Sequence, residues 1–358
     1  MSFGFLPGLL LLTPYLPCSK RPASVPDSDF SDEDRLILAC FWHPVALSRE
    51  VVGSPWSTQL LDEPIVLYRL SDGVVRAARD RCPHRGSRLS DGRIERDRLV
   101  CPYHGFAFDG SARCVDVPAH PGMAISTKLR LSPIPAREAY GLVWARLRDD
   151  GPAQLPAFDE WSSDDSVQIL PESLLWETSA GRQMESFLDV GHFAFVHRTT
   201  FGESDNTEVP SYKVARTTSG FAFDYVSTVS NYSVGSKHLN PPGFAWVRRF
   251  EVHLPFCAKL SIGFPGGGSL HILNVASPVS ACRTRVFVPI CRDFDKDAPL
   301  EESLEFNYRV FDEDRRIVER QRPKQLPLDL HEEAHVPADL ASITYRQLLA
   351  ELGLGAGG

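Results

Sequence analysis

Two short motifs, each with one cysteine and one histidine, constrain this chain more than any other feature. Cys82 and His84 form a Cys-x-His motif, and sixteen residues separate His84 from the Cys-x-x-His motif of Cys101 and His104. Two thiolates and two imidazoles in this pattern suit a [2Fe–2S] cluster in which the cysteines hold one iron and the histidines hold the other. Neutral imidazoles in place of thiolates raise the reduction potential of such a cluster, to roughly −150 to +300 mV. The motifs therefore predict a protein that carries single electrons.

A structural zinc site is the alternative, because two cysteines and two histidines also form a common zinc-binding set. A zinc finger usually has both cysteines in one short motif and both histidines in another. Here each motif has one of each, as expected if each loop provides a ligand to both irons. Pro83 and Pro102 follow the cysteines, and Gly86 and Gly105 lie just beyond the histidines, which fits two matching tight turns. This symmetry favours the iron–sulfur cluster.

Composition limits the remaining possibilities. A chain of 358 residues exceeds one ordinary domain, so two domains are expected. The apolar fraction of 43% is enough for real cores, and the net charge of −8 argues against nucleic acid or an anionic membrane as the main partner. The other cysteines form no CxxC pair, so we expect free thiols in a reducing compartment and a cytoplasmic protein. They are Cys18, Cys40, Cys114, Cys257, Cys282 and Cys291.

Local composition predicts the domain boundaries. The apolar run at residues 3–17 contains three prolines, lacks a preceding Lys or Arg, and is too short to span a bilayer. We therefore expect a flexible extension without a transmembrane span, and a peripheral membrane anchor is the alternative. The full prediction is a flexible extension at 1–34, a small all-β domain at 35–150 with both motifs at its tip, a linker at 151–166, a second domain at 167–352 and a flexible tail at 353–358.

The second domain has its own candidate metal ligands, in a segment at 184–201 that we expect to be helical. Asp189 and His192 lie one turn apart on a helix. His192 and His197 are five residues apart, which separates them by about 140° on a regular α-helix. They can therefore converge on one ion only if the helix breaks or contains a π-type turn, and Gly191 is a plausible weak point. The alternative is two ordinary histidines on an apolar helix.

A second helix, predicted at 304–323, offers a third ligand. Its inward stripe, at steps of three and four, is Val310, Phe311, position 314, Ile317 and Val318, and position 314 is an aspartate. A carboxylate in a core-facing stripe is costly unless it is paired or bound to a metal. The neighbouring charges are expected to face solvent; they are Asp312, Glu313, Arg315 and Arg316. Two histidines and one aspartate compose the facial triad that holds Fe(II), and a buried salt bridge from Asp314 to an arginine is the alternative.

Together, these motifs resemble those of the catalytic component of Rieske non-haem iron oxygenases. The similarity runs from about residue 36 to residue 350, and it is carried by CPHRG at 82–86, CPYHG at 101–105 and the Asp-x-x-His-x4-His pattern at 189–197. The segments FWHPVA, SFLDVGHFAFVH and FDEDRRIVERQRP are similar to the branch that includes methylxanthine N-demethylases, aryl O-demethylases and saxitoxin-type hydroxylases.

The resemblance implies an α+β fold. An N-terminal all-β Rieske domain would be followed by a helix-grip catalytic domain, in which an antiparallel sheet wraps around a long C-terminal helix. The implied cluster ligands are Cys82, His84, Cys101 and His104, and the implied ligands of a mononuclear Fe(II) are His192, His197 and Asp314. Asp189 would be a catalytic bridging carboxylate that links an iron-ligating histidine to a cluster-ligating histidine of the neighbouring subunit. This link implies a head-to-tail homotrimer.

The resemblance also implies an activity, in which O2 is used to hydroxylate or oxidatively demethylate a cyclic, aromatic or heterocyclic small molecule. The chain has no flavin or nicotinamide motif, so electrons from NAD(P)H would arrive through a separate reductase, with or without a ferredoxin. One position departs from the family pattern. Many relatives have an asparagine three residues before the bridging aspartate, where this chain has Ser186. Serine is shorter than asparagine and has fewer hydrogen-bond donors.

Two alternatives remain open at this point. In one, the chain is a Rieske electron carrier without a catalytic iron, whose second domain only binds a partner. Such a chain would hold the two irons of the cluster rather than three. In the other, the chain is a direct C–H hydroxylase of a natural-product intermediate rather than a demethylase, which only a product assay would distinguish.

Overall fold

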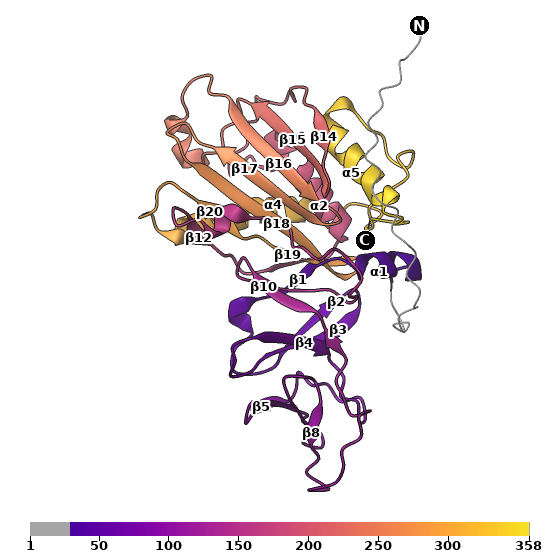
Figure 1. The fold of residues 1–358 in the computed structure, drawn as a ribbon. Helices are drawn as coiled ribbons and strands as arrows, with labels where there is room; N and C mark the ends of the chain where they lie inside the picture. Colours follow the sequence, from indigo (N-terminus) through magenta and orange to yellow (C-terminus); the bar gives the residue numbers. More distant parts are fainter. Residues whose placement is uncertain (1–28, 358) are drawn as a thin grey trace.

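The computed structural model describes residues 29–357, which form two β-rich domains (Figure 1). Residues 1–28, most of the predicted extension, lie outside the described residues. Helix α1 (Asp32–Leu38) precedes the first strand, and the Ser31 hydroxyl caps it by accepting a hydrogen bond from the Asp34 amide at 3.0 Å. Helical structure therefore begins within the segment predicted as extension. No helix among residues 29–357 is both long and apolar enough to cross a bilayer.

The first domain consists of short antiparallel strands, as predicted. Between residues 43 and 145 they form sheets with the orders β1-β11-β10, β2-β3-β4-β9 and β5-β6-β7-β8. Strands β3 and β4 are joined through Asp72 and Gly73, and Gly73 has the left-handed φ of 75° that favours glycine in a tight turn. The bounds are β1 His43–Leu47, η1 Ser48–Glu50, β2 Trp56–Leu60, β3 Glu63–Arg69, β4 Val75–Arg79, β5 Arg93–Glu95, β6 Arg98–Val100, β7 Ala107–Phe108, β8 Cys114–Asp116, β9 Pro133–Ile134, β10 Ala136–Ala139 and β11 Leu142–Ala145.

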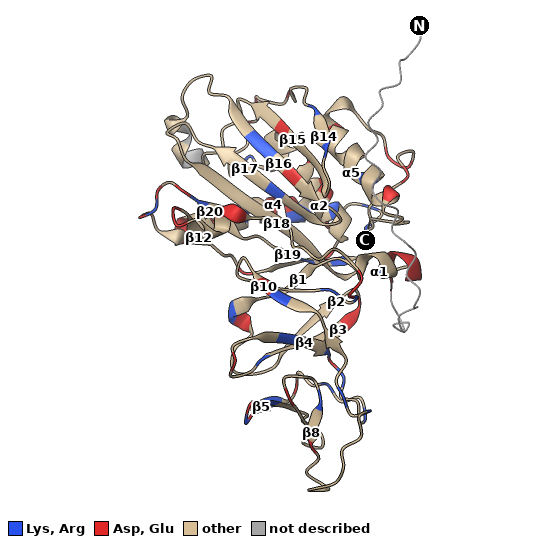
Figure 2. Cartoon of the chain, viewed as in Figure 1, with Lys and Arg blue, Asp and Glu red and all other residues tan. Residues whose placement is uncertain are grey.

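The second domain has a large antiparallel sheet with helices on one face, in agreement with the predicted helix-grip arrangement. The sheet order is β12-β20-β18-β17-β16-β15-β14, and β13 joins it through β19, which pairs with β18. Acidic and basic residues are interspersed on both domains (Figure 2). The bounds are η2 Asp159–Ser162, β12 Val167–Ile169, β13 Leu174–Trp176, α2 Ala180–Leu188, α3 Phe193–Val196, β14 Val214–Arg216, β15 Gly220–Ser227, η3 Val234–Leu239, β16 Trp246–His253, β17 Cys257–Gly263, β18 Ser269–Ser280, β19 Arg283–Phe287, β20 Ile290–Arg292, α4 Leu300–Val318, η4 Pro337–Asp339 and α5 Leu340–Glu351.

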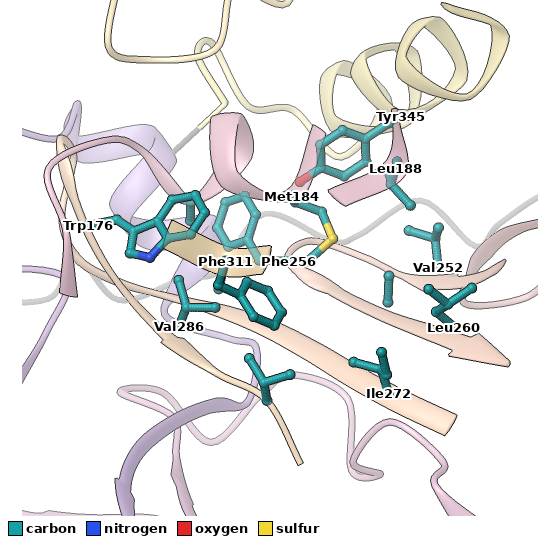
Figure 3. Packing of buried hydrophobic residues seen from close by; sticks show 14 of the residues in the cluster. Trp176, Met184, Leu188, Val252, Phe256, Leu260, Ile272, Val286, Phe311 and Tyr345 are labelled. Atoms are coloured by element: carbon teal, nitrogen blue, oxygen red, sulfur yellow. The ribbon is translucent and has the colours of Figure 1, made fainter. Parts of the chain in front are cut away.

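The inner face of this sheet holds the main core. Burial alternates along β16, which places Val252 on the inner face. The same cluster includes Met184 of α2 and Phe311 of α4 (Figure 3). Helix α5 is fixed to this core, because the buried Tyr345 hydroxyl donates a hydrogen bond to the Pro255 carbonyl at 2.8 Å. Burial of this apolar surface is the main force that holds the helices on the sheet.

The part of the outer face around β18 packs against the first domain. Leu273 of β18 and Trp144 of β11 belong to one buried cluster, and Phe158 and Trp161 join it. The segment at 151–166 was predicted as a linker, but its aromatic side chains are packed across the domain boundary. Two buried aromatic rings contribute far more to stability here than they would in a solvated linker.

The predicted flexible tail at 353–358 also differs from the structure, which describes it to residue 357. Leu354 is buried. The Gly357 amide donates to the Leu326 carbonyl at 2.9 Å, and the Gly357 carbonyl accepts from the Gly181 amide at 3.0 Å. A Cβ on Gly181 would lie 2.1 Å from that carbonyl oxygen, so only glycine permits this approach. The tail is therefore packed on the start of α2.

Helix α4 buries only part of its predicted inward stripe. Phe311 and Val318 are buried, whereas Ile317 is 51% exposed. The prediction for Ile317 is wrong because this side of α4, next to Asp314, borders a cavity instead of the core.

Candidate metal sites

The two cysteine–histidine motifs lie in two loops at the end of the first domain. The four side chains are Cys82 and His84, between β4 and β5, and Cys101 and His104, between β6 and β7. Both loops contain the same turn: the Gly86 amide donates to the Cys82 carbonyl at 2.9 Å, and the Gly105 amide donates to the Cys101 carbonyl at 3.1 Å. Both glycines have a left-handed backbone, with φ of 75° and 71°. The loops are therefore equivalent, as the sequence symmetry predicts.

The loops bring the candidate ligands face to face. The Nδ1 atoms of His84 and His104 lie 3.2 Å apart. Ligands about 2.1 Å from a tetrahedral ion lie roughly 3.4 Å apart, so both nitrogens fit as ligands of one iron. Cys82 and Cys101 are buried. Burial, with the adjacent Cys101 thiol adding to it, raises the pKa of the Cys82 thiol to about 11. The two imidazoles are thus adjacent to each other, and so are the two thiols, which fits one pair of ligands for each iron of a [2Fe–2S] cluster.

Asp80 organises the first loop, and the sequence analysis did not single it out. Its Oδ1 accepts hydrogen bonds from the amides of Leu89 and Ser90 at 2.7 and 2.8 Å. Its Oδ2 accepts another from the Ser90 hydroxyl at 2.5 Å. This fully buried carboxylate ties the end of β4 to the far side of the loop. The only signal in the sequence is an acid two residues before Cys82.

The second candidate site forms at a break between two helices. Helix α2 ends at Leu188, and Asp189 has the extended ψ of 129°. The Asp189 Oδ1 accepts the Gly191 amide at 2.6 Å, which turns the chain before α3 begins. The expectation of one helix through 184–201 is wrong, and the open alternative of a break near Gly191 is what the structure shows.

This break lets His192 and His197 approach Asp314 of α4. The two Nε2 atoms lie 3.0 Å apart. The Asp314 Oδ1 lies 3.4 Å from the Nε2 of His192 and 3.3 Å from the Nε2 of His197. Neighbouring ligands about 2.1 Å from an octahedral ion lie roughly 3.0 Å apart, so the triangle fits one face of such an ion. The Asp314 Oδ1 is also buried without a hydrogen-bond partner, as expected for an atom whose partner is a metal.

Each imidazole of the triad has a carboxylate behind it. The Nδ1 of His192 lies 3.3 Å from the Asp189 Oδ2. The Nδ1 of His197 lies 2.9 Å from the Glu313 Oε2. The expectation that Glu313 is an ordinary solvated charge is therefore wrong. Its side chain is 13% exposed. The chain after His197 folds back onto this side of α4, and the Thr199 and Thr200 hydroxyls donate hydrogen bonds to Glu313.

The charges around the triad favour a cation between them. Burial alone would raise the pKa of Asp314, but the adjacent imidazoles of His192 and His197 outweigh it and lower that pKa. Burial alone would lower the pKa of His192, but Asp189 and Asp314 outweigh it and raise the pKa to about 10. Carboxylates held ionised around two imidazoles suit a divalent metal ion.

A cavity of about 300 Å³ opens beside the triad, and α2, α4 and the segment before α5 line it. Asp189 lies at its mouth, with its side chain 39% exposed. Ser186, at the position where an asparagine was expected, also lines the cavity. So do His335 and Arg346, which have buried nitrogen atoms without a hydrogen-bond partner. The cavity is polar and leads from the surface to His192.

The structure therefore gathers every predicted ligand into one of two sites. The first site lies in the loops near β5 and β8, and the second lies among α2, α3 and α4 (Figure 1). In this view the first site lies at the lower end of the molecule, and the second lies nearer its middle, in the other domain. A single subunit does not bring them together.

Comparisons with known proteins agree with this geometry. Residues 41–130 match the family described as Rieske [2Fe-2S] domain, and residues 176–354 match the family described as vanillate O-demethylase oxygenase C-terminal domain. The methylxanthine N1-demethylase NdmA of Pseudomonas putida is 34% identical over 331 residues, which cover 90% of this chain and 91% of that protein. The methylxanthine N3-demethylase NdmB of the same species is 32% identical, with 90% of this chain and 92% of that protein covered.

Solved structures show the same similarity. The structure of Pseudomonas putida CBB5 NdmA with caffeine superposes with a TM-score of 0.79 and 31% identity, covering 89% of this chain and 92% of that one. Dicamba monooxygenase bound to dicamba superposes with a TM-score of 0.74, covering 88% of this chain and 97% of that one. At 22% identity, the second likeness shows a shared fold only.

Proposed function

Because this chain belongs to the Rieske oxygenase family, we propose that it uses O2 to hydroxylate or oxidatively demethylate a cyclic, aromatic or heterocyclic small molecule. The observation that carries the proposal is the triangle of His192, His197 and Asp314, with its buried, unpartnered carboxylate oxygen. The similarity to N1- and N3-demethylases favours a methylated heterocycle as the substrate.

We assign the metal ligands by residue. Cys82, His84, Cys101 and His104 would hold the [2Fe–2S] cluster, and His192, His197 and Asp314 would hold one Fe(II). When bound, the iron would supply O2 reduction and the cluster would supply single electrons to it. The remaining contribution of the chain is to orient these ligands and to keep bulk water from the reacting substrate.

Asp189 has a distinct role in this proposal. Its carboxylate accepts the Nδ1–H of His192 and fixes the imidazole with Nε2 toward the metal. Its exposed part remains available to a second donor at the mouth of the cavity. We assign that donor to a cluster-ligating histidine of a neighbouring subunit, which requires a head-to-tail homotrimer. The separation of the two sites in one subunit supports this assignment (Figure 1).

The cluster must be refilled with electrons from outside the chain. We assign this to a separate reductase that draws on NAD(P)H, with or without a ferredoxin. The free cysteines among the described residues support a reducing compartment, and so the cytoplasm, as the place where this occurs.

A pure electron carrier is not favoured. A second domain that only bound a partner would have no use for a buried carboxylate oxygen without a hydrogen-bond partner between two imidazoles. Iron quantitation tests this directly: an oxygenase holds three irons per chain, and a carrier holds two. Two irons per chain in fully reconstituted protein would overturn the proposed function.

A product assay tests the reaction. Purified protein would be incubated with a surrogate reductase and a panel of methylated heterocycles and methoxyarenes. Hydroxylation of an N- or O-methyl group gives a hemiaminal or hemiacetal, which collapses to formaldehyde and the demethylated product. Formaldehyde in equal amount to the demethylated product supports demethylation, and a hydroxylated product without formaldehyde supports direct C–H hydroxylation.

A further inference from the structure

We infer that Glu313 is a positioning residue of the iron site, which holds the His197 imidazole in the orientation that a metal requires. This inference rests on the proposed function, since it concerns the same three ligands. It goes further by dividing the site into an anchored arm, made of His197 and Glu313, and an open arm, made of His192 and Asp189.

The contacts of Glu313 define the anchored arm. Its Oε2 accepts from the His197 Nδ1 at 2.9 Å and from the Thr200 hydroxyl at 2.6 Å. Its Oε1 accepts from the Thr199 hydroxyl. Three donors thus hold one carboxylate, and two of them come from the second and third residues after His197.

These contacts fix the state of His197. A carboxylate behind Nδ1 requires the proton on that nitrogen, so the lone pair of Nε2 points toward His192 and Asp314. Phe201 limits rotation of the ring, because it stacks on His197 with centroids 4.6 Å apart at 28°. Asp314 is the next residue of α4, so one helix supplies both a metal ligand and the group that orients another ligand.

The two arms differ in how much of their side chains is exposed to solvent. The side chains of His197 and Glu313 are 2% and 13% exposed, whereas those of His192 and Asp189 are 16% and 39% exposed. A buried, three-fold hydrogen-bonded carboxylate suits a fixed anchor. A carboxylate at a cavity mouth suits contact with another subunit. The two carboxylates should therefore affect different properties of the protein.

Metal affinity is the property that tests Glu313. Outer carboxylates that orient metal-ligating histidines typically contribute 10–100-fold to affinity. We expect Glu313→Gln to weaken Fe(II) and Co(II) binding by about 10–100-fold, measured anaerobically by competition with a chelator. The d–d absorption of bound Co(II) should also change, because the imidazole is no longer held in one orientation. Cluster absorbance should remain, since the cluster lies in the other domain.

Matched variants make the test specific. Asp312→Asn is the control: Asp312 lies on the same helix and pairs with Arg315 and Arg316 instead of a metal ligand. Thr199→Val combined with Thr200→Val removes the donors to Glu313 without changing α4, and it should give a smaller loss of affinity in the same direction. Asp189→Asn should slow oxidation of the reduced cluster by O2 with substrate present, measured on samples whose metal loading is matched to that of the wild type.

The outcomes separate this inference from the proposed function. Wild-type protein that binds no metal at the triad would overturn the proposed function itself. If wild type binds iron, and Glu313→Gln and the double threonine variant bind it equally tightly with the same Co(II) spectrum, only the anchor role is overturned. A lower Tm of metal-free Glu313→Gln with unchanged metal affinity would mean a purely structural residue, and would equally overturn the inference.

Discussion

At the scale of single residues, each imidazole of the candidate iron site has a carboxylate behind it, Asp189 behind His192 and Glu313 behind His197. Asp189 was found because it lies three residues before His192, one helical turn away. Glu313 was missed because helical periodicity places it beside the inward stripe of α4, among charges that normally face solvent. Nothing in the sequence indicates that Thr199 and Thr200 fold back onto it. Long-range contacts of this kind have no local signature.

Removing Asp189 should uncouple the two metal sites. In Asp189→Ala we expect the visible absorption of the cluster to be unchanged, because its ligands lie in the other domain. Coupled product formation should fall to nearly zero, because this removes the carboxylate that contacts His192 and that we propose to face the neighbouring subunit. The measurement is product formed per electron consumed. Product yields similar to wild type would refute the bridging role.

Gly202 should be required for the shape of the iron site. A Cβ at this position would lie 2.2 Å from the Phe193 carbonyl oxygen and 2.9 Å from the His197 carbonyl. Gly202→Ala should therefore displace the turn that carries His197 and lower the iron affinity by about tenfold or more. Iron per chain after dialysis against a weak chelator measures this. Gly263→Ala is the matched control, because a Cβ there has no neighbour within 4 Å, and an equal loss in both variants would contradict the prediction.

At the scale of elements, a ring of charges holds α2 against α5. Arg346 of α5 contacts Glu185 of α2 at 2.6 Å and Glu333 at 2.5 Å. Arg182 of α2 contacts Glu333 at 2.6 Å and Glu185 at 3.5 Å, which closes the ring. Both arginine side chains are only 3% exposed. Removing a carboxylate partner would therefore leave a buried charge unpaired and destabilise the fold. The ring fixes α2 one turn before the break at Asp189.

Breaking this ring should destabilise the second domain. Glu333→Gln removes a charge that faces both arginines, and we expect a loss of roughly 1–3 kcal/mol in the free energy of unfolding. Urea unfolding followed by tryptophan fluorescence measures it. Glu332→Gln, at an exposed neighbouring position, should change little. Equal stability of the two variants would show that solvent screens the ring.

The same ring predicts a pH dependence. Burial alone would raise the pKa of Glu333, but Arg182 and Arg346 outweigh it and lower the pKa from 4.5 to about 2. A lowered folded-state pKa stabilises the protein above the unfolded value, and this stabilisation is lost as the pH falls from about 4.5 to about 2. The stability difference between wild type and Glu333→Gln should therefore shrink across this window. A constant difference would contradict the assigned charge state.

The elements differ in how well local sequence predicted them. Helix α5 ends as expected, with Gly353 in the left-handed conformation at φ 94°. Helix α2 is shorter than expected, because the Asp189 side chain binds the Gly191 amide and competes with the helical hydrogen bonds. Ile317 is exposed for a reason outside its own helix, since a cavity rather than a core lies opposite it. Periodicity detects amphipathic helices but not what lies across from them.

At the scale of the whole molecule, the proposed head-to-tail assembly rests on where the two candidate sites lie. The motifs predicted two candidate metal sites, and the fold places their residues in separate domains. The packed segment at 151–166 and the tail to residue 357 were not predicted, because proline, serine and glycine content indicates loops without showing whether aromatic or backbone contacts hold them.

Mixed assemblies test whether electrons cross between subunits. Cys101→Ser should lack the cluster, and Asp314→Ala should lack the catalytic iron, so each variant alone should be inactive. Co-expressed in equal amounts, they should regain up to about a quarter of wild-type activity if assembly is random and head-to-tail. Inactive mixed assemblies, confirmed as mixed by mass spectrometry, would mean that each subunit relies on its own cluster.

The large sheet is covered by helices on its inner face, and the first domain covers the part of its outer face around β18. Leu273, Val275 and Phe287 therefore meet Trp144 instead of water. The second domain produced without the first would expose these side chains as a hydrophobic patch and would be prone to aggregate. The two halves of this protein are not interchangeable modules, and a fragment made for crystallisation or engineering would have to keep the interface whole.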